Sequence, residues 1–164
     1  MGTYRSKAFV YLGGPGKVVR DTITVKCGPT DVVVEVLMCA RCGTDKTIYR
    51  CGHPNVDPNA PVVLGHELVA RVVETGRDVH KLTQGLGYRE GRRLPAAYLD
   101  FKPGERVVFQ GRIARYNREG LMLIQKPIAN LSFQLNGGYS EYMRVPKSMI
   151  RSESILRVPA GVTD

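Results

Sequence analysis

Residue types that bind metals gather in the first half of this 164-residue chain. Its four cysteines are Cys27, Cys39, Cys42 and Cys51, and the block Gly65–His66–Glu67 follows them. Each block alone is a weak signal, because a lone cysteine is usually a small buried hydrophobe and a lone histidine usually satisfies a hydrogen bond or lies at the surface. Together they supply a thiolate, an imidazole and a carboxylate. These are the ligand types of an open, catalytic zinc site.

The cysteine spacing leaves a second arrangement open. Clustered cysteines in a cytosolic chain favour metal binding or catalysis over a disulfide framework. Cys39 and Cys42 form a Cys-x-x-Cys pair that could be half of a zinc knuckle with Cys51 and His53. Outside these sets, Cys27 is expected to serve packing. The histidines His53 and His80 are expected to be exposed.

Short β-prone runs separated by glycine turns make up most of the elements that must position these groups. We expect strands at Lys7–Tyr11, Asp31–Cys39, Glu67–Glu74, Arg106–Phe109 and Tyr139–Val145. Only about 42–50 is predicted to be a short helix. The stretches 80–98 and 111–136 follow no clear period. The sequence therefore predicts a mainly β, barrel-like domain.

The composition is that of an ordinary globular protein, with 43% hydrophobic and 24% charged residues. A formal charge of +9 permits acidic partners, but a solvated surface or an inter-domain face is the favoured interpretation, so nucleic-acid binding is not expected. The apolar run Val32–Val34 is soon broken by Glu35, so no membrane span is predicted. No signal-peptide core follows Met1, and the cytoplasm is the expected location.

Four blocks in order resemble the zinc-dependent medium-chain alcohol dehydrogenases. They are Cys42–Gly43–Thr44–Asp45, Gly65–His66–Glu67, Lys102–Pro103–Gly104–Glu105–Arg106–Val107 and Gly137–Gly138–Tyr139–Ser140–Glu141–Tyr142. The resemblance covers most of the chain, from about Ala8 to Pro159. It implies the N-terminal catalytic domain of that family, a GroES-like (chaperonin-10-like) irregular β-barrel with a few short helices.

The resemblance also implies roles for single residues. Cys42 and His66 would be zinc ligands, with Glu67 an occasional ligand or a carboxylate beside the metal. Asp45 would accept a hydrogen bond from the other ring nitrogen of His66 and fix its tautomer. Thr44 would bind the alcohol and start a proton relay to solvent. Thr47 stands where the family often has the histidine that completes this relay.

Three departures from the family pattern shape the expectations. The family's second, structural zinc should fall between Phe109 and Gly137, where this chain has no cysteine, so that zinc is expected to be absent. About 80–99 is expected to be an insertion. No glycine-rich dinucleotide fingerprint is present, and the family's remaining zinc ligand usually lies beyond Asp164. Residues 1–164 are therefore interpreted as the catalytic domain alone, inactive by itself, with a zinc site that is incomplete and either weakly occupied or vacant.

The function that the resemblance implies is an alcohol or polyol dehydrogenase that uses zinc and NAD or NADP. Its partner would be a small alcohol or carbonyl substrate, and a longer parent protein is expected to be a homo-oligomer. Two alternatives stay open. One is a zinc-free enoyl or quinone reductase relative, and the other is a non-enzymatic GroES-like domain whose basic surface binds an acidic partner.

Overall fold

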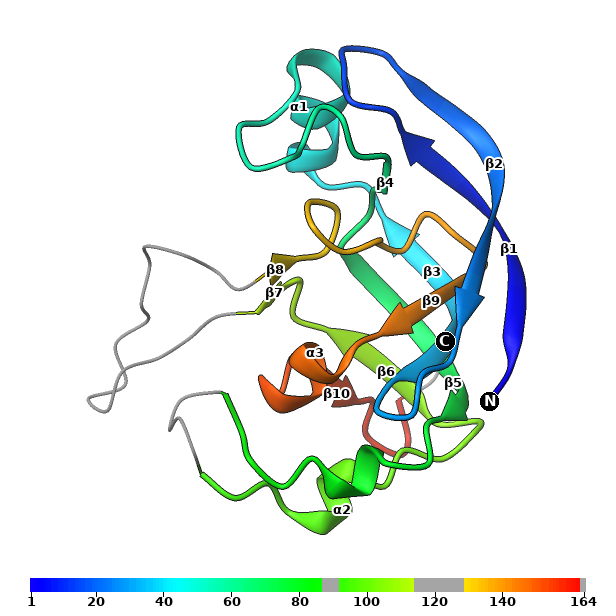
Figure 1. The fold of residues 1–164 in the computed structure, drawn as a ribbon, viewed down its shortest axis with the longest axis vertical. Helices are drawn as coiled ribbons and strands as arrows, with labels where there is room; N and C mark the ends of the chain where they lie inside the picture. The colour runs from blue at the N-terminus through cyan, green and yellow to red at the C-terminus, as the bar shows by residue number, and fades with distance from the viewer. Residues whose placement is uncertain (87–91, 114–128, 163–164) are drawn as a thin grey trace.

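The computed structural model describes residues 1–86, 92–113 and 129–162 (Figure 1). The domain is mainly β, with two larger sheets, one small sheet and a few short helices, which confirms the predicted GroES-like fold class. Within these described ranges, no helix has the length and apolar content that a membrane crossing requires.

A five-stranded antiparallel sheet carries the main core. Its order is β10 (Ile155–Arg157), β6 (Arg106–Phe109), β5 (Glu67–Thr75), β3 (Val32–Ala40) and β9 (Tyr142–Val145). The inward residues of these strands include Val34, Ala70, Val107 and Ile155, each fully buried. Burying one such side chain stabilises a fold by roughly 1.5–3 kcal/mol for valine or larger residues. Partial alternation of apolar and polar residues made β5 predictable, whereas β6 was predicted from the Lys102–Pro103–Gly104–Glu105 turn that precedes it.

The second sheet is a long hairpin with a short third strand. Strand β1 (Thr3–Tyr11) pairs with β2 (Val18–Lys26) on one side and with β4 (Val62–Val63) on the other. A pair of two-residue strands, β7 (Arg112–Ile113) and β8 (Ala129–Asn130), forms the small third sheet. Strand β2 was not predicted, because most of its residues are exposed and polar or charged. Its pairing with β1 defines it as a strand.

Strand β1 joins the two larger sheets into one barrel-like wall. Ser6, fully buried, accepts a hydrogen bond from the backbone N–H of Tyr142 at 2.9 Å. Phe9 donates its backbone N–H to the carbonyl of Tyr139 at 2.8 Å, and Ala8 forms an isolated bridge with Ser140. The strand predicted at Tyr139–Val145 therefore begins only at Tyr142. Its first residues instead form the loop that ties β1 to β9.

The helices are few and short. Helix α1 (Gly43–Cys51) lies where the sequence predicted a helix, beside the β1–β2 turn at the top of Figure 1. Two further short helices, α2 (Ala96–Leu99) and α3 (Lys147–Arg151), and a 3₁₀ turn at Val79–Lys81 were not predicted. With three to five residues each, they are too short to carry a helical period.

The stretch expected to be an insertion packs onto the main core where it is described. Leu94 and Leu99 are buried in the same cluster as the five-stranded sheet, and Leu82 and Tyr98 pack against it. The Tyr98 hydroxyl donates to the carbonyls of Ile150 and Ile155. The described parts of 80–99 are thus part of the domain core. Residues 87–91, and most of the expected structural-zinc lobe at 114–128, lie outside the described residues.

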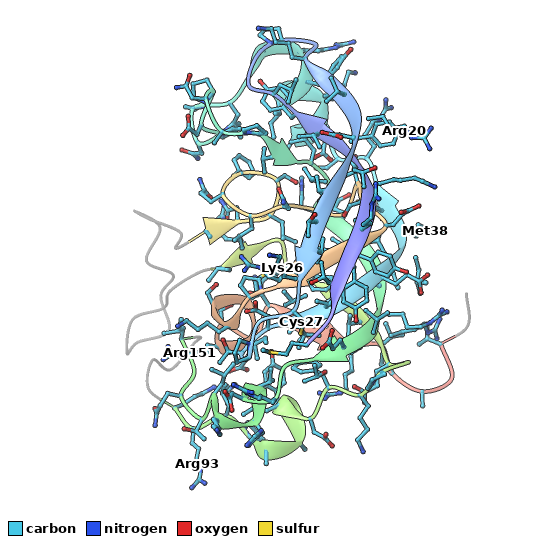
Figure 2. All side chains as sticks on the ribbon, turned by 45° about the vertical axis from the view of Figure 1, so that its right-hand side comes forward. Arg20, Lys26, Cys27, Met38, Arg93 and Arg151 are labelled. Carbon is cyan, nitrogen blue, oxygen red and sulfur yellow. The ribbon has the colours of Figure 1, made fainter. Side chains whose placement is uncertain are left out.

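The basic residues are distributed along the molecule. Figure 2 shows Arg20 extending from the upper right side of the molecule and Arg93 from its lower end, with Lys26 and Arg151 between them in height. Several other cations form ion pairs, as Arg157 does with Glu105 at 3.2 Å. This distribution agrees with a solvated surface.

Candidate metal centre

The metal-donor residues come from two neighbouring segments. Cys42 is the residue before α1, and His66 and Glu67 stand at the start of β5. One donor atom from each of Cys42, His66 and Glu67 lies within 4.8 Å of the other two. Among residues 1–86, 92–113 and 129–162, this is the one group of three such side chains that could hold a metal ion. A sulfur, a nitrogen and an oxygen therefore converge at one place.

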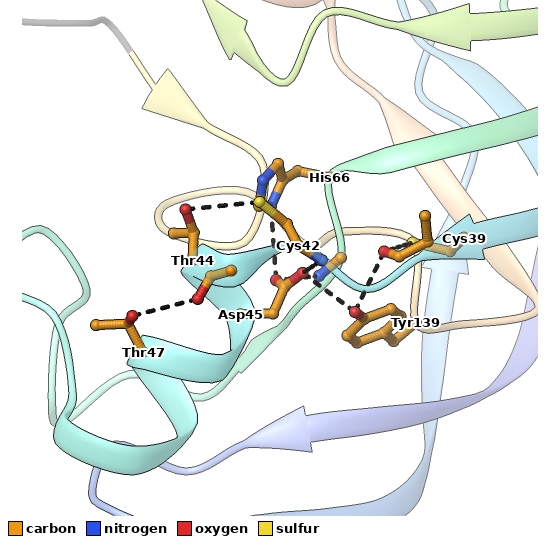
Figure 3. A network of polar contacts seen from close by, with 10 residues as sticks. Cys39, Cys42, Thr44, Asp45, Thr47, His66 and Tyr139 are labelled. Atoms are coloured by element: carbon orange, nitrogen blue, oxygen red, sulfur yellow. Dashed lines mark hydrogen bonds and ion pairs between the residues drawn. The ribbon is translucent and has the colours of Figure 1, made fainter.

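The start of α1 explains how Cys42 is held. Asp45, the third residue of the helix, reaches back and accepts the backbone N–H of Cys42 at 3.0 Å through Oδ2. This is one half of a capping-box contact, and it fixes the first turn of the helix. The Cys42 side chain points away from the helix towards His66 (Figure 3). Helix capping and donor orientation thus depend on the same carboxylate.

Asp45 also contacts the second donor segment. Only 3% exposed, it accepts the backbone N–H of Gly65 at 3.2 Å through Oδ1, and the same oxygen lies 3.5 Å from Nδ1 of His66. That distance is within ion-pair range, but Nδ1 has no partner with the geometry of a hydrogen bond. The expected hydrogen bond between Asp45 and His66 is therefore not formed, although the two groups are close enough for an ion pair. The contact on Nδ1 leaves Nε2 of His66 available for a ligand.

The electrostatics of the centre favour positive charge between Cys42 and Asp45. Contact with the Asp45 carboxylate raises the pKa of His66 to about 9, with burial opposing this and Cys42 adding to it. Hydrogen bonds from Thr44 and the nearby His66 lower the pKa of the Cys42 thiol. Burial opposes ionisation of Asp45, but His66 and the N–H groups of Cys42 and Gly65 outweigh it and lower the pKa of Asp45. A thiol with a lowered pKa and a carboxylate on either side of the His66 imidazole favour a cation at this place.

The two threonines of α1 lie in different places. The Sγ of Cys42 is 3.7 Å from the hydroxyl oxygen of Thr44, so Thr44 borders the donor group. Thr47 is exposed, and its hydroxyl donates to the carbonyl of Gly43 at 3.2 Å. The structure therefore brings Thr44 next to Cys42 and leaves Thr47 on the outer face of the helix. Their part in proton transfer stays a prediction.

The members of the rival knuckle do not gather. Cys39 is half-buried with its thiol directed to the carbonyl of Ala40, and Cys51 is exposed at the end of α1. His53 is half-buried, not exposed as expected, because its ring packs edge-on against Phe133 at 4.8 Å. In the described parts of the chain, these residues form no group of three donors with Cys42. Cys27 is buried among β-strand residues, as its packing role requires.

Two features around the donors were not predicted from the sequence. Gly65 has a φ of +91°, and a Cβ there would lie 2.7 Å from Sγ of Cys39 and 2.8 Å from Cδ1 of Tyr139. The hydroxyl of Tyr139 donates to Oδ2 of Asp45 at 3.1 Å. The block Gly137–Tyr142 was recognised as a family marker and as the start of a strand, and no role at the donor group was predicted for it. Nothing in a tyrosine 94 residues from Asp45 signals such a contact.

The fold is that of a GroES-like domain. The family model for the alcohol dehydrogenase GroES-like domain matches residues 28–87. L-threonine 3-dehydrogenase from Streptomyces avermitilis is 30% identical over 141 residues, which are 83% of this chain and 36% of that protein. (R,R)-butanediol dehydrogenase from Bacillus subtilis is 27% identical over 135 residues, 76% of this chain and 34% of that protein.

Solved structures agree on the fold. The 2R,3R-butanediol dehydrogenase of Bacillus subtilis superposes with a TM-score of 0.68 at 22% identity, over 96% of this chain and 42% of that one. A zinc-binding dehydrogenase candidate from Sinorhizobium meliloti 1021 bound to NADP gives 0.69 at 23% identity, over 98% and 40%. The chain belongs to the alcohol dehydrogenase family and contains the GroES-like domain that the family model describes. It spans little more than a third of the length of the curated relatives that it matches.

Proposed function

We propose that this domain binds a catalytic zinc ion through Cys42, His66 and Glu67, and that it serves an NAD(P)-dependent alcohol or polyol dehydrogenase. The observation that carries the proposal is the convergence of these three donor atoms within 4.8 Å. Around a tetrahedral zinc, sulfur and nitrogen ligands lie about 3.5 Å apart. Side-chain adjustments of about 1 Å would close the group around an ion.

The donor types also suit zinc and its chemistry. A borderline-soft cation accepts a thiolate, an imidazole and a carboxylate, and three protein ligands leave one position for substrate. Zinc bound there supplies Lewis-acid polarisation of an alcohol or carbonyl oxygen. Cys42 and His66 would be its constant ligands. Glu67, which is exposed, would bind it or remain beside it.

The residues around the donors would move the proton. In this proposal Thr44, next to Cys42, accepts a hydrogen bond from the substrate hydroxyl and passes its proton towards solvent. Asp45 keeps Nδ1 of His66 engaged, so that Nε2 faces the metal. Thr47 would pass the proton on through water, although its hydroxyl donates to Gly43 in the conformation described.

The coenzyme would be held outside these 164 residues. No glycine-rich strand–turn–helix fingerprint for a dinucleotide occurs in the sequence. Relatives that are nearly three times as long act as dehydrogenases of threonine or butanediol, and one structural neighbour was solved with NADP. These relatives support a small hydroxylated substrate and NAD or NADP as hydride acceptor.

The donor group weighs against the two rival functions. A zinc-free reductase relative has no use for a thiolate, an imidazole and a carboxylate at one place. A domain that bound an acidic partner only through its basic residues would not need these three donors at one place. We therefore prefer the zinc-binding function.

Metal analysis of paired cysteine variants tests the proposal. Cys42→Ser should abolish stoichiometric zinc binding, because serine is a poor ligand near neutral pH. Cys39→Ser is the matched control: it is three residues away, and its thiol is directed to a backbone carbonyl. It should bind zinc like the unmodified chain. Equal loss in both variants would favour the knuckle arrangement. Absence of zinc from a form of the protein that also carries a coenzyme-binding part would overturn the proposal.

Calorimetric titration tests the placement of the coenzyme. The 164-residue chain should give no binding heat with NAD or NADP and should show no alcohol oxidation when zinc is present. Tight binding of either dinucleotide would contradict the view that the coenzyme is held elsewhere.

A further inference from the structure

The hydroxyl of Tyr139 meets the carboxylate that both donor segments share. It donates to Oδ2 of Asp45 at 3.1 Å and also lies 3.3 Å from the carbonyl oxygen of Ala40 (Figure 3). Burial and the nearby Asp45 carboxylate raise the pKa of Tyr139, so the phenol stays protonated and acts as a donor at neutral pH. The contact thus joins a third segment, distant in sequence, to the metal-donor group.

With Tyr139 included, each carboxylate oxygen of Asp45 contacts two other groups. Oδ2 accepts from Cys42 N–H at 3.0 Å and from Tyr139, whereas Oδ1 accepts from Gly65 N–H at 3.2 Å and faces His66. Rotation of the carboxylate would lengthen these contacts together. A second donor on Oδ2 opposes that rotation and keeps Oδ1 directed at the imidazole.

Tyr139 is itself held by backbone contacts to the histidine segment. Its N–H donates to the carbonyl of Leu64 at 2.9 Å, and Gly138 N–H donates to the carbonyl of Gly65 at 2.7 Å. A Cβ on Gly137 would lie 2.0 Å from the carbonyl oxygen of Gly65, so only glycine allows this approach. The ring therefore packs directly over the backbone that precedes His66.

We propose that Tyr139 is a positioning residue of the metal centre, whose hydroxyl fixes Asp45 and through it the orientation of His66 towards Cys42. The inference rests on the proposed zinc function. It also gives a role to the Gly–Gly–Tyr part of the fourth sequence block. Tyr139 would touch neither metal nor substrate.

The variant Tyr139→Phe tests this role, because it removes the hydroxyl and keeps the ring. Binding of zinc and cobalt to the 164-residue chain, measured by competition with a chromogenic chelator, should weaken about tenfold. Loss of a group that orients a metal-ligating histidine typically costs 10–100-fold. The matched control is Tyr142→Phe in the same block, whose hydroxyl makes no hydrogen bond with any described residue. It should leave both affinities unchanged.

A spectrum and a double variant separate positioning from a general structural effect. At saturating cobalt, the visible ligand-field bands of Tyr139→Phe should shift, whereas those of Tyr142→Phe should match the unmodified chain. In an Asp45→Ala background, Tyr139→Phe should weaken binding no further, because its effect passes through Asp45. If Asp45→Ala does not fold by circular dichroism, Asp45→Asn replaces it, and the Tyr139→Phe effect should then be reduced.

The outcomes distinguish the two proposals. If the 164-residue chain binds neither zinc nor cobalt, the same variants are compared in a form of the protein that also carries a coenzyme-binding part. If that form binds neither metal, the proposed function fails and the inference with it. If the chain binds them and Tyr139→Phe has the same affinity and spectrum, the inference alone is wrong. A full, undiminished effect of Tyr139→Phe in the Asp45→Ala background would also overturn it.

Discussion

The metal-donor end and the sheet core of this domain are stabilised in different ways. The metal-donor end, which comprises 42–45, 65–67 and Tyr139, depends on single polar atoms at defined distances around Asp45. The sheet core is the buried cluster on the five-stranded sheet, and it depends on apolar volume from many side chains. One missing oxygen should disturb the first, whereas the second should respond to lost methyl groups. Substitutions should therefore separate metal chemistry from stability.

The largest difference between an effect on activity and an effect on stability is expected at Thr44. In a form of the protein that carries a coenzyme-binding part, Thr44→Ala should lower turnover by about 100-fold or more, the scale of a lost proton-transfer group. Zinc content and the free energy of unfolding should stay nearly constant. Thr44→Ser, which keeps the hydroxyl, should be much milder. Unchanged turnover in Thr44→Ala would remove Thr44 from the mechanism, and an equal loss in Thr47→Ala would place both hydroxyls in one relay.

In the sheet core, a substitution is expected to lower stability while leaving zinc affinity nearly unchanged. Ile155 is fully buried, so Ile155→Ala should lower the free energy of unfolding by about 2–5 kcal/mol through lost burial and a cavity. Zinc affinity of the folded protein should change less than about twofold, since Ile155 belongs to the buried apolar cluster and not to the donor group. Leu156→Ala, at a neighbouring side chain that is 48% exposed, is the control and should cost far less in denaturant unfolding. A strong loss of metal in Ile155→Ala would show that the regions are coupled.

At Gly65, a single substitution should lower both the stability of the domain and its zinc binding. Gly65→Ala meets both a φ of +91° and close contacts with Cys39 and Tyr139, and it should cost about 1–3 kcal/mol in stability. It should also weaken zinc binding, because it displaces the segment that bears His66. Gly104→Ala is the matched control, since Gly104 has a φ of +94° with open space around it. Thermal unfolding and zinc titration of both variants should show the metal effect only at Gly65.

The smallest effect concerns pH and lies away from both regions. Burial opposes ionisation of Glu74, but hydrogen bonds from the Tyr4 hydroxyl and the Gly2 N–H outweigh it and lower the pKa of Glu74. Because the folded pKa lies below the unfolded value of about 4.3, this stabilisation is complete above that value and is lost as pH falls through the folded pKa. Glu74→Gln should flatten the acid side of a stability–pH curve. Parallel curves for the two proteins would contradict the assignment.

Sequence patterns predicted what depends on periodicity and local motifs. Strands β3, β5 and β6 and helix α1 carry clear valine runs, turn residues or a capping position, and all lie close to where they were expected. Strand β2 was missed because Arg20, Asp21 and Thr22 resemble a loop, and only pairing with β1 makes them a strand. For such an exposed hairpin arm, tertiary contacts outweigh local composition.

The candidate site was predictable in its members and not in its support. The donor types of Cys42, His66 and Glu67 can be recognised one residue at a time. The roles of Asp45 and Thr44 came from family resemblance, since spacing alone does not reveal which carboxylate will face a histidine 21 positions away. Tyr139 could not have been found, because its contact with Asp45 exists only when β1, β4 and the Gly137–Gly138 turn are assembled.

The long sequence separations within the Asp45 network bear on how fast the domain unfolds. Asp45 reaches 20 residues to Gly65 and 94 residues to Tyr139, and contacts this distant form only after long loops have closed. We expect the donor geometry to be incomplete in the folding transition state. An ion bound to the donors would therefore stabilise the native state and not the transition state. A bound metal should therefore slow unfolding while leaving the refolding rate nearly unchanged. The metal would therefore increase the kinetic stability of the folded domain without helping to nucleate its folding.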